Sequence, residues 1–334
     1  MPSTMPSAVD DLATLKDWLR YAVSSFTKAK LVYGHGTANA VDEAAFLILS
    51  TLNLPIDNLE PWLDCRLTRD ERERLLLVIS ARITTRKPAP YLIQSAWIQG
   101  HKFYVDERVI VPRSYIGELL CSDQLSTAVT DPQGVTSVLE LCTGSGCLAI
   151  LAALAFPNAN VTAIDISNDA LEVARRNVTD YELSQRVSVL KSDLYEAIAD
   201  QRFDLIIANP PYVTSAAVAA FPPEYRAEPE LAHLGGCDGL DVVKRIIDDA
   251  PNYLRPNGVL VVEIGDAREA LDAAYPLLPF LWLDTEVSEG EVFTLTAEDL
   301  SSVTKPSQAK QVSPPGSRAN TSRNARLVQP NAPK

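Results

Sequence analysis

Strand-like apolar runs alternate with helical stretches through the second half of the chain, and this order constrains the fold more than any other feature. The runs are VLEL (138–141), VTAIDI (161–166), VSVL (187–190), FDLIIA (203–208) and GVLVVEI (258–264). Helical patterns lie between them, at 148–155, 169–178 and 242–254. Alternation of this kind is typical of a parallel sheet with helices on both faces. We therefore predict an α/β fold, with two further antiparallel strands at one edge within residues 280–296.

The first third of the chain follows a different pattern. Residues 10–31 place apolar side chains on one helical face, a second helix is expected over about 41–52, and Thr68-Arg69-Asp70-Glu71 has the form of a capping box that starts a third. We predict a helical, substrate-recognising domain over 1–88. The aromatic and β-branched residues 91–111 predict a β-hairpin in a linker of residues 89–115.

The linker leads to an α/β domain predicted over residues 116–300. After it, residues 301–334 are rich in Pro, Ser, Asn and Gln and contain few large apolar residues. Such a composition predicts a disordered tail, and here the tail is basic.

Composition excludes several classes of protein. No apolar run reaches the roughly 18 to 20 residues of a membrane-spanning helix, and the N-terminus lacks the basic-then-apolar order of a signal peptide. We therefore expect a cytoplasmic protein with no membrane partner. The five cysteines and three histidines show no metal-ligand spacing, so neither disulfides nor a metal site is expected.

The net charge of −13 is unevenly distributed. Residues 301–334 hold six basic residues and no acidic one, which leaves 24 basic and 43 acidic residues, a formal charge of −19, in residues 1–300. A nucleic acid is bound mainly by Lys and Arg that neutralise phosphates, so this body repels it. A basic protein partner is attracted instead.

A glycine turn follows the first apolar run, in the order Glu140-Leu141-Cys142-Thr143-Gly144-Ser145-Gly146. Glycines let the backbone approach a ligand closely, although simple packing of a helix on a sheet also uses them. Asp165 ends the next run about 20 residues on, where a carboxylate can accept the ribose hydroxyls of NAD or of S-adenosylmethionine. Glu140 favours the second, because its charge attracts a cationic amino group and repels a pyrophosphate. Asp193, after the third run, is placed for an adenine edge or for a helix N-cap.

The motif Asn209-Pro210-Pro211-Tyr212 ends the fourth apolar run. Ligands of doubly wound sheets sit beyond the carboxyl ends of strands, and proline restricts both its own backbone and that of the residue before it. The Asn209 side-chain oxygen and the Pro210 carbonyl can accept both N–H bonds of a planar amine or amide, while Tyr212 packs on its plane. Orientation and electrostatics would then favour methyl transfer to that nitrogen. A simple Pro-Pro turn is the alternative.

Together these residues resemble the S-adenosylmethionine-dependent amino-methyltransferases, and more narrowly the HemK-like protein-(glutamine-N(5)) methyltransferases. Val111-Pro112-Arg113-Ser114, ahead of Gly117-Glu118-Leu119, resembles the branch that methylates the third large-subunit ribosomal protein, L-three. The release-factor branch usually carries a Pro-Arg-Pro-Glu-Thr form at this point. The loop Gly34-His35-Gly36-Thr37 and the run Glu228-Pro229-Glu230-Leu231 are also similar to the ribosomal-protein branch. The likeness covers roughly residues 10–300 and implies a Rossmann-like domain with a seven-stranded, mostly parallel sheet.

The resemblance also implies roles for individual residues. The cofactor S-adenosylmethionine would be held by Glu140 and the loop residues Cys142, Thr143, Gly144, Ser145 and Gly146, by Asp165 and Ile166 at the ribose, by Asp193 and Leu194 at the adenine, and by Asn209. Substrate would be bound by Asn209, Pro210, Pro211, Tyr212 and Arg113, with Asn209, Pro210 and Tyr212 catalytic. Arg113 could also order the linker near the active site, or merely pair with a local carboxylate. Two residues depart from the family pattern, since Glu140 replaces the commoner aspartate and Tyr115 stands where this branch often has proline.

Other functions fit parts of the pattern. An adenine-specific DNA methyltransferase also uses Asn-Pro-Pro-Tyr, but it must approach a polyanion, which the acidic body disfavours. An NAD-dependent oxidoreductase would leave that motif unexplained, and a binding module without catalysis would not need it. We therefore predict glutamine methylation of a basic protein, ribosomal protein L-three, with a release factor as the alternative substrate.

Overall fold

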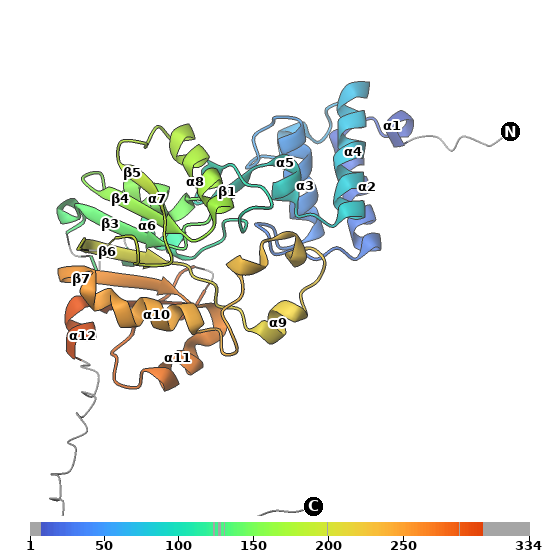
Figure 1. Ribbon diagram of the computed structural model, residues 1–334. Helices are drawn as coiled ribbons and strands as arrows, with labels where there is room; N and C mark the ends of the chain where they lie inside the picture. Colours follow the sequence, from blue (N-terminus) through green and yellow to red (C-terminus); the bar gives the residue numbers. More distant parts are fainter. Residues whose placement is uncertain are drawn as a thin grey trace, which may run out of the picture. The chain divides into compact units, whose positions relative to one another are not determined.

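The computed structural model describes residues 8–302, apart from 123, 126, 127, 130, 199 and 287 (Figure 1). The tail predicted to be disordered lies outside these residues, except for Ser301 and Ser302, which end a helix. In the described part of the chain, no helix combines the length and apolar character needed to cross a membrane. The α-helices are α1 (Ala8–Asp11), α2 (Leu15–Ala29), α3 (Ala40–Thr51), α4 (Arg69–Thr85), α5 (Ala89–Ile93), α6 (Ile116–Cys121), α7 (Cys147–Ala155), α8 (Asn168–Asp180), α9 (Ser215–Ala219), α10 (Asp241–Asp249), α11 (Arg268–Ala274) and α12 (Ala297–Ser302).

The larger of two sheets has seven strands in the order β5-β4-β3-β6-β7-β9-β8. Strands β3 to β7 run parallel, and β9 pairs antiparallel with both β7 and β8. This confirms the predicted α/β fold with an antiparallel hairpin at one edge. The strand bounds are β3 (Ser137–Leu141), β4 (Asn160–Asp165), β5 (Val187–Lys191), β6 (Phe203–Ala208), β7 (Leu254–Glu263), β8 (Leu281–Leu283) and β9 (Val292–Thr296).

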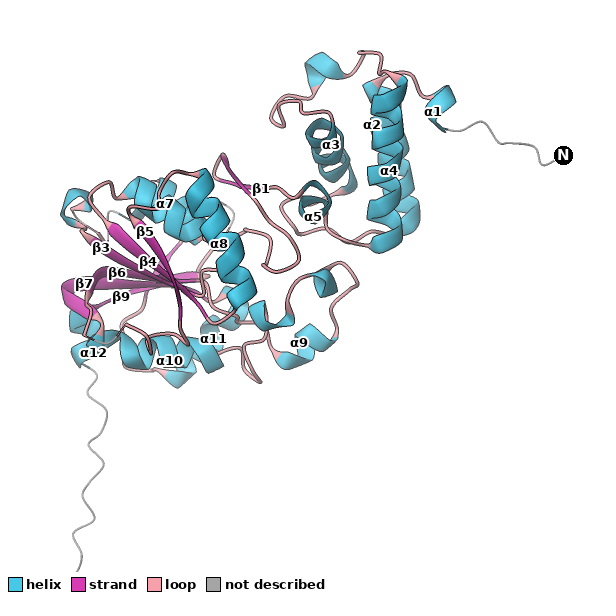
Figure 2. Ribbon diagram, turned by 45° about the horizontal axis from the view of Figure 1, so that its top comes forward, coloured by secondary structure: helices cyan, strands magenta, loops and turns pink. Residues whose placement is uncertain are grey.

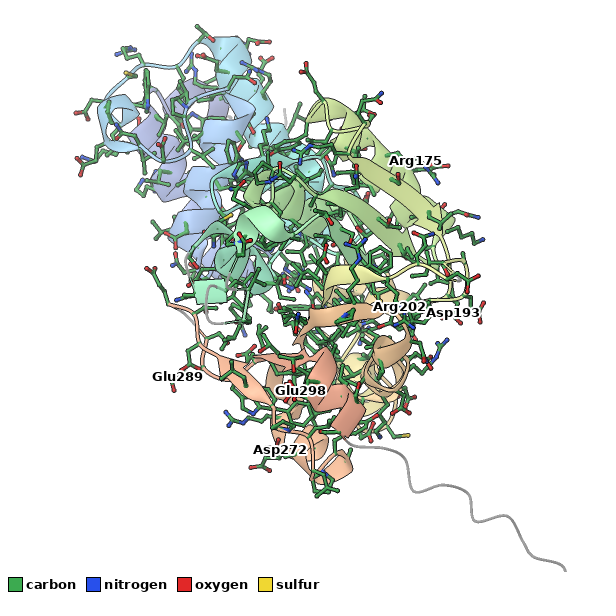
Figure 3. All side chains as sticks on the ribbon, turned by 90° about the vertical axis from the view of Figure 1, so that its left-hand side faces the viewer. Arg175, Asp193, Arg202, Asp272, Glu289 and Glu298 are labelled. Carbon is green, nitrogen blue, oxygen red and sulfur yellow. The ribbon has the colours of Figure 1, made fainter. Side chains whose placement is uncertain are left out.

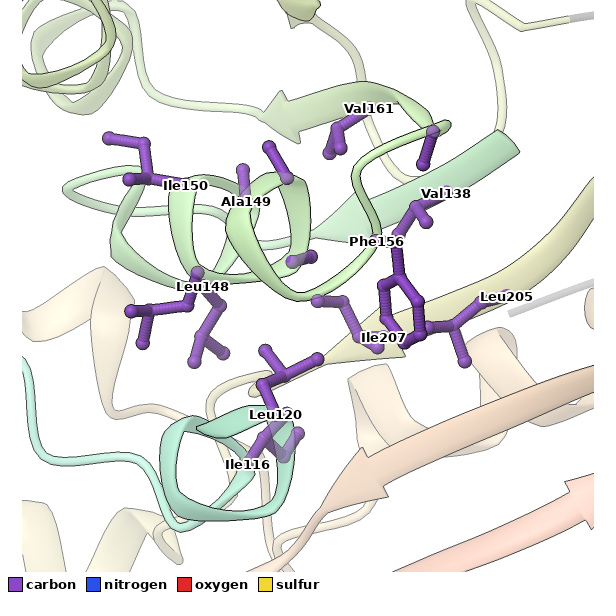
Figure 4. Packing of buried hydrophobic residues seen from close by; sticks show 14 of the residues in the cluster. Ile116, Leu120, Val138, Leu148, Ala149, Ile150, Phe156, Val161, Leu205 and Ile207 are labelled. Atoms are coloured by element: carbon purple, nitrogen blue, oxygen red, sulfur yellow. The ribbon is translucent and has the colours of Figure 1, made fainter. Parts of the chain in front are cut away.

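Both faces of this sheet are buried. Successive strand residues point to opposite sides, and each of the two sets of side chains packs into its own apolar cluster. Val138 and Leu205 join one apolar cluster with α6 and α7, while Leu139 and Ile206 join another with α10 and α11. Figure 2 shows the strands between two layers of helices, and Figure 4 shows the first cluster, where side chains of α6 and α7 meet the sheet. The chain leaves the centre at β3 towards β5 and returns at β6 beside β3, so strand order reverses between the carboxyl ends of these two central strands. This is the place where ligands bind in such sheets.

The N-terminal helices differ from the prediction at their start. A single helix over residues 10–31 is wrong, because α1 ends at Asp11 and α2 begins only at Leu15. Thr14 is extended and caps α2 in a reciprocal capping box with Asp17, and its backbone also bridges to Arg66. The capping box predicted at Thr68 is confirmed, with Glu71 as its second member. Helices α2, α3 and α4 share an apolar cluster built around the fully buried Trp18.

The predicted β-hairpin is present but shorter than 91–111. Strands β1 (Ala96–Ile98) and β2 (His101–Phe103) pair antiparallel, while α5 precedes them and residues 104–115 form no regular structure. A hairpin of three-residue strands leaves the backbone after it without strand partners, so other groups must satisfy it. The division of the chain at residues 88/89 and 115/116 stays a prediction.

Asn177 of α8 satisfies part of that backbone. Its side-chain oxygen accepts from Tyr104 N (2.8 Å), and its amide nitrogen donates to the carbonyls of Tyr104 (3.0 Å) and Ser145 (2.8 Å). Asn177 is buried, and Ser145 belongs to the glycine turn after β3. One side chain thus ties the residues after the hairpin to the turn at the centre of the sheet.

We expect Asn177→Leu, which nearly preserves volume, to lower the free energy of unfolding by about 2 to 4 kcal/mol, because it leaves three buried or partly buried backbone groups without a partner. Urea unfolding would measure this. The control is Asp180→Asn on the same helix, which removes only an exposed pair with Arg176 and should change stability by less than about 0.5 kcal/mol. Equal effects of the two substitutions would contradict the role given to Asn177.

Candidate functional site

A cavity of about 660 Å³ lies beyond the carboxyl ends of the central strands. Its volume falls in the range of roughly 300 to 1,000 Å³ that is usual for small-molecule sites. Eleven residues singled out in the sequence line it, namely Arg113, Cys142, Gly144, Asp165, Ile166, Asp193, Leu194, Asn209, Pro210, Pro211 and Tyr212. The structure thus brings these eleven residues, which are up to about 100 positions apart in sequence, around one cavity. Glu140, Thr143, Ser145 and Gly146 do not line it.

The glycine turn presents backbone to this cavity. Cys142, Gly144 and Gly146 all have positive φ (59°, 54° and 80°), a region that L side chains rarely adopt. A Cβ atom on Gly146 would lie 3.1 Å from the Cβ of Ala174, so this glycine serves the packing of α8. A Cβ atom on Gly144 would find its nearest neighbour 3.9 Å away and would reach toward the cavity instead. The turn is therefore a cradle that a bound group can approach closely.

Two acidic residues flank the cradle. The Asp165 carboxylate, at the end of β4, accepts from Gly144 N and from Ser167 N, both at 2.9 Å, and burial raises its pKa above the usual value. Asp193 lies 2.9 Å from a guanidinium nitrogen of Arg245, on α10. Beside these acids, Ile166 is 47% exposed although it is apolar. A carboxylate at the strand end, an apolar side chain next to it and an open glycine turn together fit a nucleoside-containing cofactor such as S-adenosylmethionine.

Glu140 lies behind the cradle. It is buried on β3, accepts a hydrogen bond from the Thr143 hydroxyl, and does not reach the lining of the cavity. Burial raises its pKa to about 8. Glu140 does not reach the cavity and its raised pKa favours the uncharged form near neutral pH, so its predicted attraction for a cationic amino group has no support from this geometry and stays a prediction.

The Asn-Pro-Pro-Tyr motif leaves the end of β6 and is fixed by a neighbouring segment. Val213 N donates to His233 O (2.9 Å), and Gly235 N donates to Val213 O (2.8 Å). These bonds pair the chain just after the motif with residues 233–235. The backbone of Asn209 to Tyr212 is thus held between the last strand residue, Ala208, and this short parallel pairing.

Arg113 pairs with a buried carboxylate, although Glu228 is 115 residues away in sequence and not a local partner. Its guanidinium donates to both oxygens of Glu228, at 2.7 and 2.8 Å, and Val111 N donates to the same side chain at 2.9 Å. Burial alone would raise the pKa of Glu228, but the hydrogen bonds from Arg113 and the neighbouring side chains of His233 and His35 hold it well below the usual value. Arg113 still lines the cavity, so it bounds the site while its charge is already paired.

Glu263 was not singled out from the sequence, although it ends the apolar run GVLVVEI beside the strand that carries the motif. It is 1% exposed at the end of β7. Its carboxylate accepts from the Tyr212 hydroxyl (3.1 Å), the Ser114 hydroxyl (2.6 Å) and Tyr115 N (2.9 Å). An acid after a buried strand was the available signal, but its partners, about 50 and 150 residues away in sequence, could not be derived locally.

Comparison with known proteins agrees with this geometry. Residues 121–221 match the family model described as methyltransferase small domain. Three relatives carry the name ribosomal protein uL3 glutamine methyltransferase. The one from Burkholderia pseudomallei is 53% identical over 90% of this chain and 99% of its own, the one from Bradyrhizobium diazoefficiens is 55% identical over 87% and 92%, and the one from Bordetella pertussis is 52% identical over 87% and 97%.

The buried Glu140 gives a pH prediction with a definite sign. The folded protein keeps this proton up to a pH of about 8, whereas the unfolded chain releases it above about 4.5. The folded state therefore binds more protons in this window, and stability falls as the pH rises through it. In Glu140→Gln nothing titrates at this position, so we expect the wild type to lose about 3 to 4 kcal/mol relative to the variant between pH 5 and pH 8.

Urea unfolding of both proteins at the two pH values would measure this difference. All other titrations are common to the two proteins and cancel in the comparison. Parallel stability curves would show that Glu140 is ionised throughout.

Proposed function

The chain belongs to the family of the ribosomal protein uL3 glutamine methyltransferases, and on this premise we propose that it transfers a methyl group from S-adenosylmethionine to the side-chain amide nitrogen of a glutamine in uL3. The observation that carries the proposal is the identity of 52 to 55% over most of the chain to relatives of that name. The cavity that joins the glycine turn to the Asn-Pro-Pro-Tyr motif supports it. A release factor is the alternative substrate.

The substrate amide is a poor nucleophile, because its nitrogen lone pair is delocalised into the carbonyl. We assign its two N–H bonds to the Asn209 side-chain oxygen and the Pro210 carbonyl, and its flat face to Tyr212. Pro210 and Pro211 restrict the backbone that carries these acceptors. Catalysis then comes from orientation and from stabilisation of the positive charge that develops on nitrogen. The methyl group would pass from the sulfur of the bound donor to this nitrogen, whose proton would then go to water.

S-adenosylmethionine supplies the methyl group on a positively charged sulfur. We assign its ribose to Asp165, its adenine to the space bounded by Ile166, Asp193 and Leu194, and its amino acid end to the turn that begins at Cys142, with Asn209 near the reacting centre. The exposed backbone of Gly144 supports this assignment. Thr143, Ser145 and Gly146 do not line the cavity, so we assign them to holding the turn in shape, and Glu140 supports the turn from behind by accepting the hydrogen bond of the Thr143 hydroxyl.

A basic protein suits the charge of this enzyme better than DNA does. Acidic side chains such as Asp272 and Glu289 lie exposed on the surface, and Figure 3 labels both, with the exposed basic Arg175 in a different part of the view. The formal charge of residues 1–300 is −19. Lys- and Arg-rich proteins, as ribosomal proteins are, are attracted by such a field, and a polyanion is repelled. We accordingly propose a cytoplasmic enzyme that has no DNA or membrane partner.

The substrate can be tested directly. The purified protein is incubated with S-adenosylmethionine carrying a labelled methyl group, together with either uL3 or a release factor, and the label is located by mass spectrometry. We expect one methyl group on a glutamine side chain of uL3. Label on the release factor alone would refute the substrate, and label on neither protein, while the cofactor binds in calorimetry, would refute glutamine methylation of both.

The clamp assigned to Asn209 can be tested by substitution. In Asn209→Ala we expect turnover to fall by about 100-fold or more, since orientation of the amide is lost, while the dissociation constant of the cofactor changes by less than about threefold. Steady-state kinetics and calorimetry measure the two effects. The control is Asn160→Ala, at the exposed start of β4, which should leave both values unchanged. Full activity of Asn209→Ala would refute the clamp.

A further inference from the structure

The end of β7 lies directly beside the motif that carries the proposed chemistry. Ala208, the last residue of β6, pairs with Val262, so Glu263 stands at the level of Asn209 on the neighbouring strand. Glu263 is buried and does not line the cavity, whereas Tyr212 does. Glu263 therefore does not touch a substrate in the cavity directly, but it contacts a side chain that does line it.

This contact is with the hydroxyl of Tyr212, which donates to one carboxylate oxygen of Glu263 at 3.1 Å. Burial, and then the charge of Glu263, raise the pKa of Tyr212 well above its usual value, so the phenol keeps its proton and remains the donor. The other oxygen of Glu263 accepts from the Ser114 hydroxyl at 2.6 Å and from Tyr115 N at 2.9 Å. The carboxylate is thus fixed on one side by the linker and holds Tyr212 on the other.

The ring of Tyr212 is also confined along its edge. Two residues after Glu263 the chain turns through Gly265, whose φ is +51°. A Cβ atom there would lie 2.7 Å from Cε2 of Tyr212, closer than real Cβ contacts occur, and 3.1 Å from Cδ2, which is tighter than most. The turn Glu263-Ile264-Gly265 therefore confines Tyr212 at two places: Glu263 binds its hydroxyl, and the missing side chain of Gly265 leaves room for its ring.

On the basis of the proposed function, we propose that Glu263 is a positioning residue for methyl transfer, which sets the plane of the Tyr212 ring against the substrate amide. A weak nucleophile reacts only within a narrow range of orientations, so a ring that can rotate or tilt costs turnover. Cofactor affinity is not affected, because neither the hydroxyl of Tyr212 nor Glu263 belongs to the glycine turn.

A double-mutant cycle tests this role. We expect Tyr212→Phe and Glu263→Gln each to lower kcat about tenfold, with the dissociation constant of S-adenosylmethionine, measured by calorimetry, changed less than about threefold. If Glu263 acts through the hydroxyl of Tyr212, the double variant should be no more than about twofold slower than Tyr212→Phe alone. Two effects that multiply, or a Tyr212→Phe variant with unchanged kcat, would overturn the proposal.

The proposal stays testable even where Glu263→Gln fails to fold. Tyr212→Phe removes a single oxygen, and an unchanged kcat in that variant overturns the proposal on its own. A crystal structure of Glu263→Gln gives a readout that does not depend on activity. We expect the Tyr212 ring to be displaced or disordered in it, and a ring in its original place would overturn the proposal. A wild type that methylates neither uL3 nor a release factor would refute the proposed function instead, which is a different result from a cycle whose effects multiply.

Discussion

The buried carboxylate of Glu228 is the constraint on which the arrangement around the site depends. An ion taken out of water must be paired and hydrogen-bonded, or its burial costs several kcal/mol. Here the partners come from distant parts of the chain: Arg113 and Val111 N from the linker, His233 at 3.0 Å, and His35 of the N-terminal loop at 3.5 Å. If one of these segments moved, the Glu228 carboxylate would lose a partner or become exposed to solvent. The wall of the cavity formed by Arg113 is therefore fixed by a residue outside the cavity.

A second buried ionic group extends the same constraint to the helices. Arg82 is fully buried on α4, donates to Glu43 of α3 at 2.6 Å, and lies 3.9 Å from Glu224, which also contacts Arg86 at 3.1 Å. Glu224 is four residues before Glu228, in the segment that follows α9. Removing one member of such a group destabilises the protein by more than the group contributes, because the remaining charges stay buried without a partner. The helices and the segment after the motif must therefore fold together.

The parts that sequence could predict are those set by local pattern. The strand runs, the capping box at Thr68, the glycine turn and the position of Asp165 at a strand end all follow from residues that are close in the chain. The start of α2 was missed because Thr14 competes with helix continuation, through a cap to Asp17 and a bridge to Arg66. The roles of Glu228 and Glu263 were missed for a different reason. Arg113 is 115 residues from Glu228 and Ser114 is 149 residues from Glu263, and only the tertiary fold brings these partners together.

Glu228 and Glu263 also explain how a linker without regular secondary structure can bound a site that depends on orientation. Residues 104–115 form no regular structure, yet Val111 and Arg113 are bound to Glu228, and Ser114 and Tyr115 to Glu263. Besides the attachment of Tyr104 to Asn177, the linker is thus fixed at two neighbouring points, by Glu228 at Val111 and Arg113 and by Glu263 at Ser114 and Tyr115. Because Glu263 also holds Tyr212, the position of the linker and the position of the aromatic ring are set by the same carboxylate. A change in the linker is therefore transmitted to the ring, even where no linker residue touches the substrate.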